Sequence, residues 1–146
     1  MLRILTNLNL LNRFDLEATA GLIASGYTGT WVRKIADDKI DLVSNAATDF
    51  AFGTVWTESY RDGTIGSWTP DVGITGKLSV VYGKFRALTD QFTGAPAIGN
   101  ALVVNTAGQL AVGTYGTDRI VAFCTKASHS ISHLGRTHTV IEIMTV

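Results

Sequence analysis

Short apolar runs separated by glycine and asparagine constrain the fold of this chain most strongly. Residues 95–126, APAIGNALVVNTAGQLAVGTYGTDRIVAFCTK, contain three such runs, at Ala101–Val104, Gln109–Val112 and Ile120–Cys124. Runs rich in Val and Ile that are bounded by Gly and Asn are typical of β-strands, and Gly108 suits the positive φ of a tight turn between two of them. The segment therefore predicts part of a small β-barrel or β-sandwich.

The same pattern continues through most of the chain, with almost no helical periodicity. Asp37 and Asp38 mark a hairpin turn, and the two prolines, Pro70 and Pro96, lie outside the expected strands, where the missing N–H does no harm. The further strands are expected at residues 30–35, 40–44, 50–56, 77–82, 84–89 and 137–145. The strand at 84–89 is expected to continue the pairing of the strand before it. The fold class is therefore mainly β.

The two halves of the chain repeat one pattern. Gly29–Lys34 aligns with Gly99–Val104 at an offset of 70 residues, and Asp49 aligns with Asp118 at an offset of 69. Each half contains a strand, a tight turn, a strand, a loop with Asp and two further strands. Identities are few, so the repeat is one of pattern. It predicts two small β-barrel or β-sandwich modules that are related by an internal repeat.

Residues 1–16 differ from the rest because their apolar side chains follow neither a helical nor a strand period throughout. We expect them to form an extended N-terminal arm that packs on its own domain or on a neighbour, since a segment this apolar is not stable in water. A first strand or helix of the domain core is the alternative. The expected organisation is then the arm, a first β-module at 17–83 and a second at 84–146, either separate or joined in one compact domain.

Composition points to a protein that works in an assembly. Charged residues make up only 16% of the chain, and 12 basic residues balance 12 acidic ones. A surface without excess charge gives no reason to expect a nucleic acid or an anionic membrane as partner. Soluble monomers normally keep their net charge away from zero, so the balance favours a subunit of an assembly. Asn7, Asn9 and Asn12 interrupt any signal-like apolar segment, and no run approaches the roughly 18 apolar residues of a membrane span, so we expect synthesis in the cytoplasm.

Candidate metal ligands are few. His129, His133 and His138 lie close together near the end of the chain, and Glu142 is the one carboxylate near them. A metal site would need these side chains to converge. Residues 127–136 are instead interpreted as an exposed loop rich in Ser, Gly and His, so no metal and no cofactor are expected.

No catalytic motif is present either. The single cysteine, Cys124, lies within an apolar run, where a thiol acts as a small hydrophobic group. The chain has no G-x-S-x-G elbow, and residues 73–77 have the wrong spacing for a phosphate-binding loop. Asp37 and Asp38 serve turn chemistry. No enzymatic activity is expected.

Three stretches of the second half carry a resemblance to a known family. AIGNALVVNTAGQL at 97–110, DRIVA at 118–122 and VIEI at 140–143 combine a Gly before an apolar strand, a turn with Gly and an Asp before a further strand. In this they resemble the small capsid decoration, or cement, proteins of tailed bacteriophages. The first half shares the resemblance only through the internal repeat.

The resemblance implies a structural virion protein that binds the outer face of the capsid and clamps adjacent major capsid subunits. Its implied partners are the major capsid protein and copies of itself, as a homotrimer or homodimer, with no nucleic acid and no membrane. Family members often use an N-terminal arm for such contacts, and Trp and Tyr are typical interface anchors. The residues expected at the interface are Leu2, Ile4, Leu5, Leu8, Leu10, Phe14, Tyr60 and Trp68.

Two other classes of function remain open. A tail-tube, connector or fibre-adaptor subunit of the virion would share the β-rich composition and the low charge. A carbohydrate-binding module would instead present Tyr60, Trp68 and Tyr115 on an exposed face.

Overall fold

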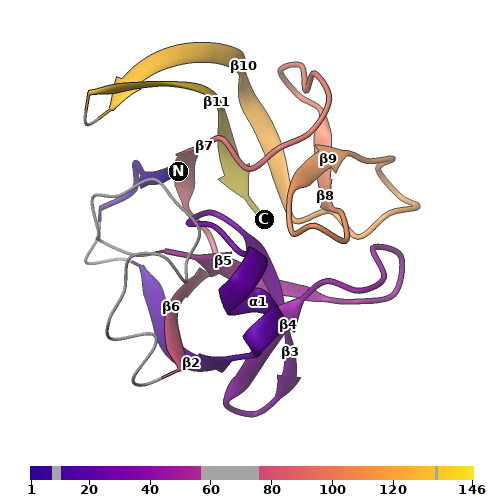
Figure 1. Cartoon of the computed structure of the whole chain (residues 1–146). Coiled ribbons are helices and arrows are strands. Elements are labelled where there is room, and N and C mark those ends of the chain that lie inside the picture. The colour runs from indigo at the N-terminus through magenta and orange to yellow at the C-terminus, as the bar shows by residue number, and fades with distance from the viewer. Residues whose placement is uncertain (8–10, 57–75, 134) are drawn as a thin grey trace.

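The structure is a computed structural model, which describes residues 1–7, 11–56, 76–133 and 135–146. It is a mainly β protein with a closed five-stranded barrel, a six-stranded antiparallel sheet and one short helix (Figure 1). The barrel contains β2 (Asn12–Ala18), β3 (Trp31–Ala36), β4 (Lys39–Leu42), β5 (Ala51–Val55) and β6 (Lys77–Tyr82). The sheet contains β1 (Leu2–Ile4), β7 (Arg86–Thr89), β8 (Ala101–Val104), β9 (Leu110–Val112), β10 (Ala122–His133) and β11 (Arg136–Thr145).

The barrel is closed by a parallel pairing between β2 and β4, and its other strand pairs are antiparallel. Alternate side chains point inward, as strand geometry requires. Helix α1 (Ala20–Ser25) follows β2 and buries Leu22 in the barrel core. The hydroxyl of Thr19 caps this helix by accepting a hydrogen bond from Leu22 N at 3.2 Å. The sequence did not predict α1, because six residues are too few to show a helical period.

The sheet has the strand order β1-β7-β11-β10-β8-β9. Read from β9, five strands of the sheet follow the order β9-β8-β10-β11-β7. Read from β4, the barrel strands follow the order β4-β3-β5-β6-β2, so β9 corresponds to β4, β8 to β3, and so on. A parallel bridge between Phe92 and Leu110 brings the segment after β7 beside β9, as β2 lies beside β4 in the barrel. The two units therefore connect their strands in the same order.

One apolar core joins the two units. Trp31, Val43 and Val81 of the barrel half pack in a single cluster with Leu102 and Ile141 of the sheet. Each such side chain contributes about 1.5–3 kcal/mol when it is fully buried. The turn between β8 and β9 also meets the barrel directly, because Trp31 N donates a hydrogen bond to Gly108 O at 2.8 Å.

Residues 1–16 do not form an extended arm in their described part. Leu2–Ile4 pairs with β7 as β1, and Asn12–Ala18 pairs with β6 as β2. Leu2 is buried in the shared core and Leu16 in the barrel core. The segment is therefore ordered within its own subunit because its apolar side chains are buried there, as in the alternative of a first core strand.

The expected loop at residues 127–136 is also wrong. β10 runs to His133 and β11 begins at Arg136, so most of this segment is a β-hairpin with pairs such as Ser130–Thr139 and Ser132–Thr137. The strand at 84–89 is confirmed in part, as β7, but it pairs with β1 and β11 and not with β6. Gly83, at a φ of 82°, turns the chain away from the barrel there.

Replacement of Gly108 by Ala tests the contact between the two units. Gly108 has a φ of 72°, and a Cβ there would lie 2.5 Å from Thr30 Cγ2 and 2.8 Å from Trp31 O. Strain and overlap together should lower the free energy of unfolding by at least about 2 kcal/mol. Gly94→Ala is the matched control, since φ is 75° and nothing lies within 4 Å of the added Cβ. Equal losses in chemical denaturation would contradict the close contact.

Candidate functional site

Three aromatic rings stack at the end of the barrel opposite α1. Phe14 and Tyr82 lie with ring centroids 5.1 Å apart and an interplanar angle of 11°, and Phe52 stacks on Tyr82 at 5.0 Å and 24°. The rings come from β2, β6 and β5, which are neighbours in the barrel. Lys34 Nζ lies 5.7 Å from the Phe52 centroid, within cation–π range. Phe14 remains 51% exposed, so the stack presents an aromatic ring to solvent.

A groove continues from this stack toward the sheet. Its volume is about 410 Å³, within the size range of ligand sites. The barrel side of the groove includes Phe50, Phe52 and Tyr82, and the sheet side includes Ile120, Val121 and Val146. Phe50 is 67% exposed. We call Phe14, Phe50, Phe52 and Tyr82 the aromatic patch.

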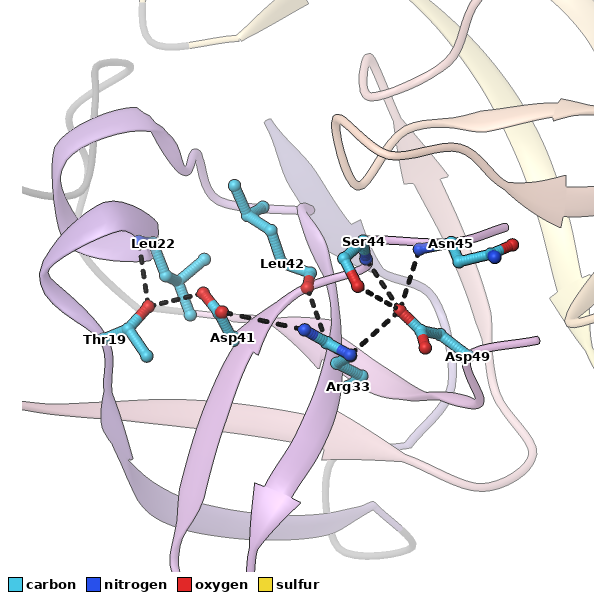
Figure 2. A network of polar contacts seen from close by, with 8 residues as sticks. All are labelled: Thr19, Leu22, Arg33, Asp41, Leu42, Ser44, Asn45 and Asp49. Atoms are coloured by element: carbon cyan, nitrogen blue, oxygen red, sulfur yellow. Dashed lines mark hydrogen bonds and ion pairs between the residues drawn. The ribbon is translucent and has the colours of Figure 1, made fainter. Parts of the chain in front are cut away.

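Phe50 is held in place by the carboxylate of the preceding residue, Asp49. Its Oδ2 accepts hydrogen bonds from Ser44 N at 2.7 Å, Asn45 N at 2.9 Å and Ser44 Oγ at 3.0 Å, and lies 3.1 Å from Arg33 Nη1 (Figure 2). The backbone hydrogen bond from Asn45, with those from Ser44 and the nearby Arg33 guanidinium, lowers the pKa of Asp49. The loop between β4 and β5 is therefore closed on itself at the residue before Phe50.

Arg33 links this loop to the rest of the barrel. Its Nε donates a hydrogen bond to Leu42 O at 3.0 Å, and its Nη2 lies 4.0 Å from Asp41 Oδ2. Asp41 in turn accepts a hydrogen bond from the hydroxyl of Thr19, the residue that caps α1 (Figure 2). A chain of polar contacts thus extends from α1 to the loop that presents Phe50. Both carboxylates are engaged in this network and act as structural groups.

The histidines lie in the β10–β11 hairpin, away from the aromatic patch. The rings of His133 and His138 lie 6.3 Å apart, and His138 Nδ1 lies 3.2 Å from Asp90 Oδ2. Asp90 also forms an ion pair with the ammonium group of Met1. Among the described residues, no group of three or more His, Cys, Asp or Glu side chains is arranged to hold a metal ion.

The thiol of Cys124 is buried, as the sequence indicates. Burial raises the pKa of Cys124, which favours the neutral thiol over the reactive thiolate. Its sulfur lies 3.3 Å from Lys126 O.

The residues expected at the interface fall into three groups. Leu2 is buried and Ile4 packs against the shared core, so both side chains serve their own subunit. Leu5 and Phe14 are exposed. Leu8, Leu10, Tyr60 and Trp68 lie outside the described residues.

Sequence reasoning missed Phe50, Phe52 and Tyr82 as candidate surface residues. A signal was present, since Phe50 and Phe52 are two residues apart and a strand places such residues on one face. Phe14 and Tyr82 come from distant parts of the chain, and only the pairing of β2 with β6 brings them together.

Comparison with known proteins gives no family for this chain: no protein-family model matches it, and no curated protein matches it. In the described part of the chain, no helix has the length and apolar character that a membrane span requires.

The Asp49 network predicts a specific pH dependence. Because its pKa is lowered from an ordinary value of 3.8, Asp49 stabilises the fold above that pH, and the stabilisation is lost as the pH falls through the lower, folded-state value. Asp49→Asn should therefore be less stable than the wild type near neutral pH. The difference between their thermal midpoints should narrow on acidification to about pH 3. Asp37→Asn, in an exposed turn, is the control; a constant difference for Asp49→Asn would contradict the assignment.

Proposed function

We propose that this protein is a non-enzymatic structural protein of a tailed-phage virion. It binds the outer surface of the capsid and stabilises the shell by clamping adjacent major capsid subunits. The exposed aromatic patch is the observation that carries this proposal. Phe14 and Phe50 are more than half exposed. Phe50 lines the apolar groove between the barrel and the sheet, and Phe14 stacks on Tyr82, which also lines it.

The patch has the chemistry of a protein-binding surface. Aromatic side chains are enriched at interface cores, where a few of them supply most of the binding energy. Here Phe14, Phe52 and Tyr82 already stack on one another, so little freedom of these side chains is lost on binding, and Asp49 closes the loop that precedes Phe50. Lys34 is the cation next to the rings, and the groove itself is lined mainly by apolar residues.

The assignment to a capsid rests on the sequence resemblance of the second half, together with physical reasoning about shells. A protein that binds only the assembled shell stabilises it by mass action. Modest contacts repeated over many symmetry-related sites add up to a large reinforcement. The balanced charge of the chain suits such a subunit.

We also infer that the two halves are related by an internal repeat. Besides the shared strand order, the loops at Asp49 and Asp118 have two hydrogen bonds in common. Asp49 N donates to Asn45 O at 2.8 Å, and Asp118 N donates to Thr114 O at 2.9 Å. Each carboxylate Oδ2 accepts from the same relative position, Asn45 N at 2.9 Å and Thr114 N at 2.7 Å.

The repeat also explains where the groove lies. At an offset of 69 residues, Ala51 and Phe52 of the barrel side correspond to Ile120 and Val121 of the sheet side. The groove is therefore lined by equivalent segments of the two halves. Only the barrel half carries aromatic side chains at these positions, so the two sides of the groove differ in chemistry.

Carbohydrate binding is the second candidate function. Tyr115 is 77% exposed, with its ring 6.2 Å from that of Phe123, and an exposed tyrosine face suits stacking against a sugar. A tail or connector subunit remains the alternative within the virion.

Co-sedimentation with shells assembled from the major capsid protein tests the proposal. Phe14→Ala combined with Phe50→Ala should weaken binding at least about tenfold, because the double change removes the exposed anchors. Tyr115→Ala is the control, since it removes an aromatic ring outside the patch that is even more exposed than Phe14 and Phe50. Circular dichroism checks that each variant is folded.

Wild-type binding by the double variant would remove the aromatic patch from the capsid contact. Failure of the wild-type protein to bind shells at all would contradict the decoration role. Glycan affinity of the free protein, abolished by Tyr115→Ala, would support the second candidate instead.

A further inference from the structure

The strands at the two edges of the sheet, β1 and β9, are only three residues long each. A longer unpaired edge among the described residues belongs to β10, which lies between β11 and β8 in the sheet. β10 pairs with β8 only at Ala122 and Phe123. The backbone contact ends at Cys124, whose N donates to Asn100 O at 3.0 Å and whose O accepts from Gly99 N at 2.8 Å. Beyond that point the only strand paired with β10 in the described part of the chain is β11. The carbonyls of Lys126 and Ala127 lie 3.3 Å from Cys124 Sγ and 3.0 Å from His129 Nδ1. The other backbone N–H and C=O groups of residues 125–133 that face away from β11 have no partner among the described residues.

From His129 onward, this edge lacks the features that usually prevent strand addition. Proteins protect exposed edges with charged side chains, proline or very short strands. Residues 127–133, ASHSISH, contain no Lys, Arg, Asp, Glu, Pro or Gly. Lys126 is the one Lys or Arg in β10. The two irregularities in the pairing of β10 with β11 lie on either side of Lys126, between Cys124 and His129. From His129 onward the pairing with β11 is regular.

The hairpin is also held firmly enough to serve as a template. On one face, Ile131 packs against a cluster of Met1, Leu88 and Val140, which anchors the hairpin to β1 and β7. On the other face, the pairs Ser130–Thr139 and Ser132–Thr137 are small, polar and exposed. These side chains project above and below the hairpin, not along the outer edge of β10.

We propose that the outer edge of β10 at Thr125–His133 is a self-association surface, on which a second copy of this chain adds its own β10 antiparallel. This pairing is isologous, so each copy contributes the same backbone edge. It extends the sheet of one subunit into the sheet of the other. The proposal concerns the free protein and does not depend on capsid binding.

Charge and length favour a second copy as the occupant. In a two-fold pairing the uncharged segment 127–133 lies opposite itself, so no formal like charges meet there, and Ser side chains can hydrogen bond across the strands. The free stretch ends at β8 on one side and at the hairpin turn on the other. A copy of the same stretch matches this length.

Sedimentation equilibrium of two matched double variants tests the proposal. Ser130→Lys with Ser132→Lys places two charges on the edge strand and should raise the dimer dissociation constant at least about tenfold by like-charge repulsion. Thr137→Lys with Thr139→Lys adds the same charge to the same exposed face, but on β11, one strand farther from the partner. This control should dimerise nearly as the wild type does.

Hydrogen exchange of the wild-type protein gives a second test that needs no variant. Amides within residues 125–133 should exchange more slowly at high protein concentration than at low concentration, because a dimer pairs the outer edge. A monomeric wild type, exchange that does not change with concentration, or equal dimerisation by the β10 double variant and the wild type would each overturn the proposal. An equal loss of dimerisation in both lysine variants would also overturn it, since the effect would then be one of net charge alone.

Discussion

The apolar core shared by the barrel and the sheet is the constraint on which the rest of the structure depends. This core buries Trp31 and Val81 of the barrel half together with Leu102 and Ile143 of the sheet. These side chains are shielded from water because the two units pack against each other. Neither unit alone would cover these side chains. The chain is thus one packed molecule built from two similarly connected halves, and the groove beside the aromatic patch lies along the line where they meet.

Two features shape the surface along the boundary between the barrel and the sheet. The Asp49 carboxylate organises the loop before β5 and so presents Phe50, while the barrel strands stack Phe14 and Phe52 on Tyr82. The polar network contributes position and the rings contribute apolar area. We propose that this surface binds a protein partner, because rings that already stack on one another lose little entropy on association.

The sequence predicted the strands well where glycine and β-branched residues delimit them, as at Lys77–Tyr82 and Ala101–Val104. The strand expected at 137–145 is confirmed as β11, but the sequence did not predict that β10 continues through residues 127–133, because Ser and His have weak strand preference and the pairing partner supplies the order. The short β1 was hidden for a related reason: it is a strand only because β7 lies beside it. The aromatic patch could be predicted only in part, since Phe14 reaches Tyr82 through a pairing that local pattern does not reveal.

The copy number of this protein in purified virions, measured by quantitative mass spectrometry against the major capsid protein, tests the central claim most directly. A decoration protein is bound at every equivalent position of the shell. We therefore predict a copy number equal to that of the major capsid protein or to a simple fraction of it. A copy number matching a single vertex or the tail would place the protein elsewhere in the virion, and its absence from the particles would contradict the account.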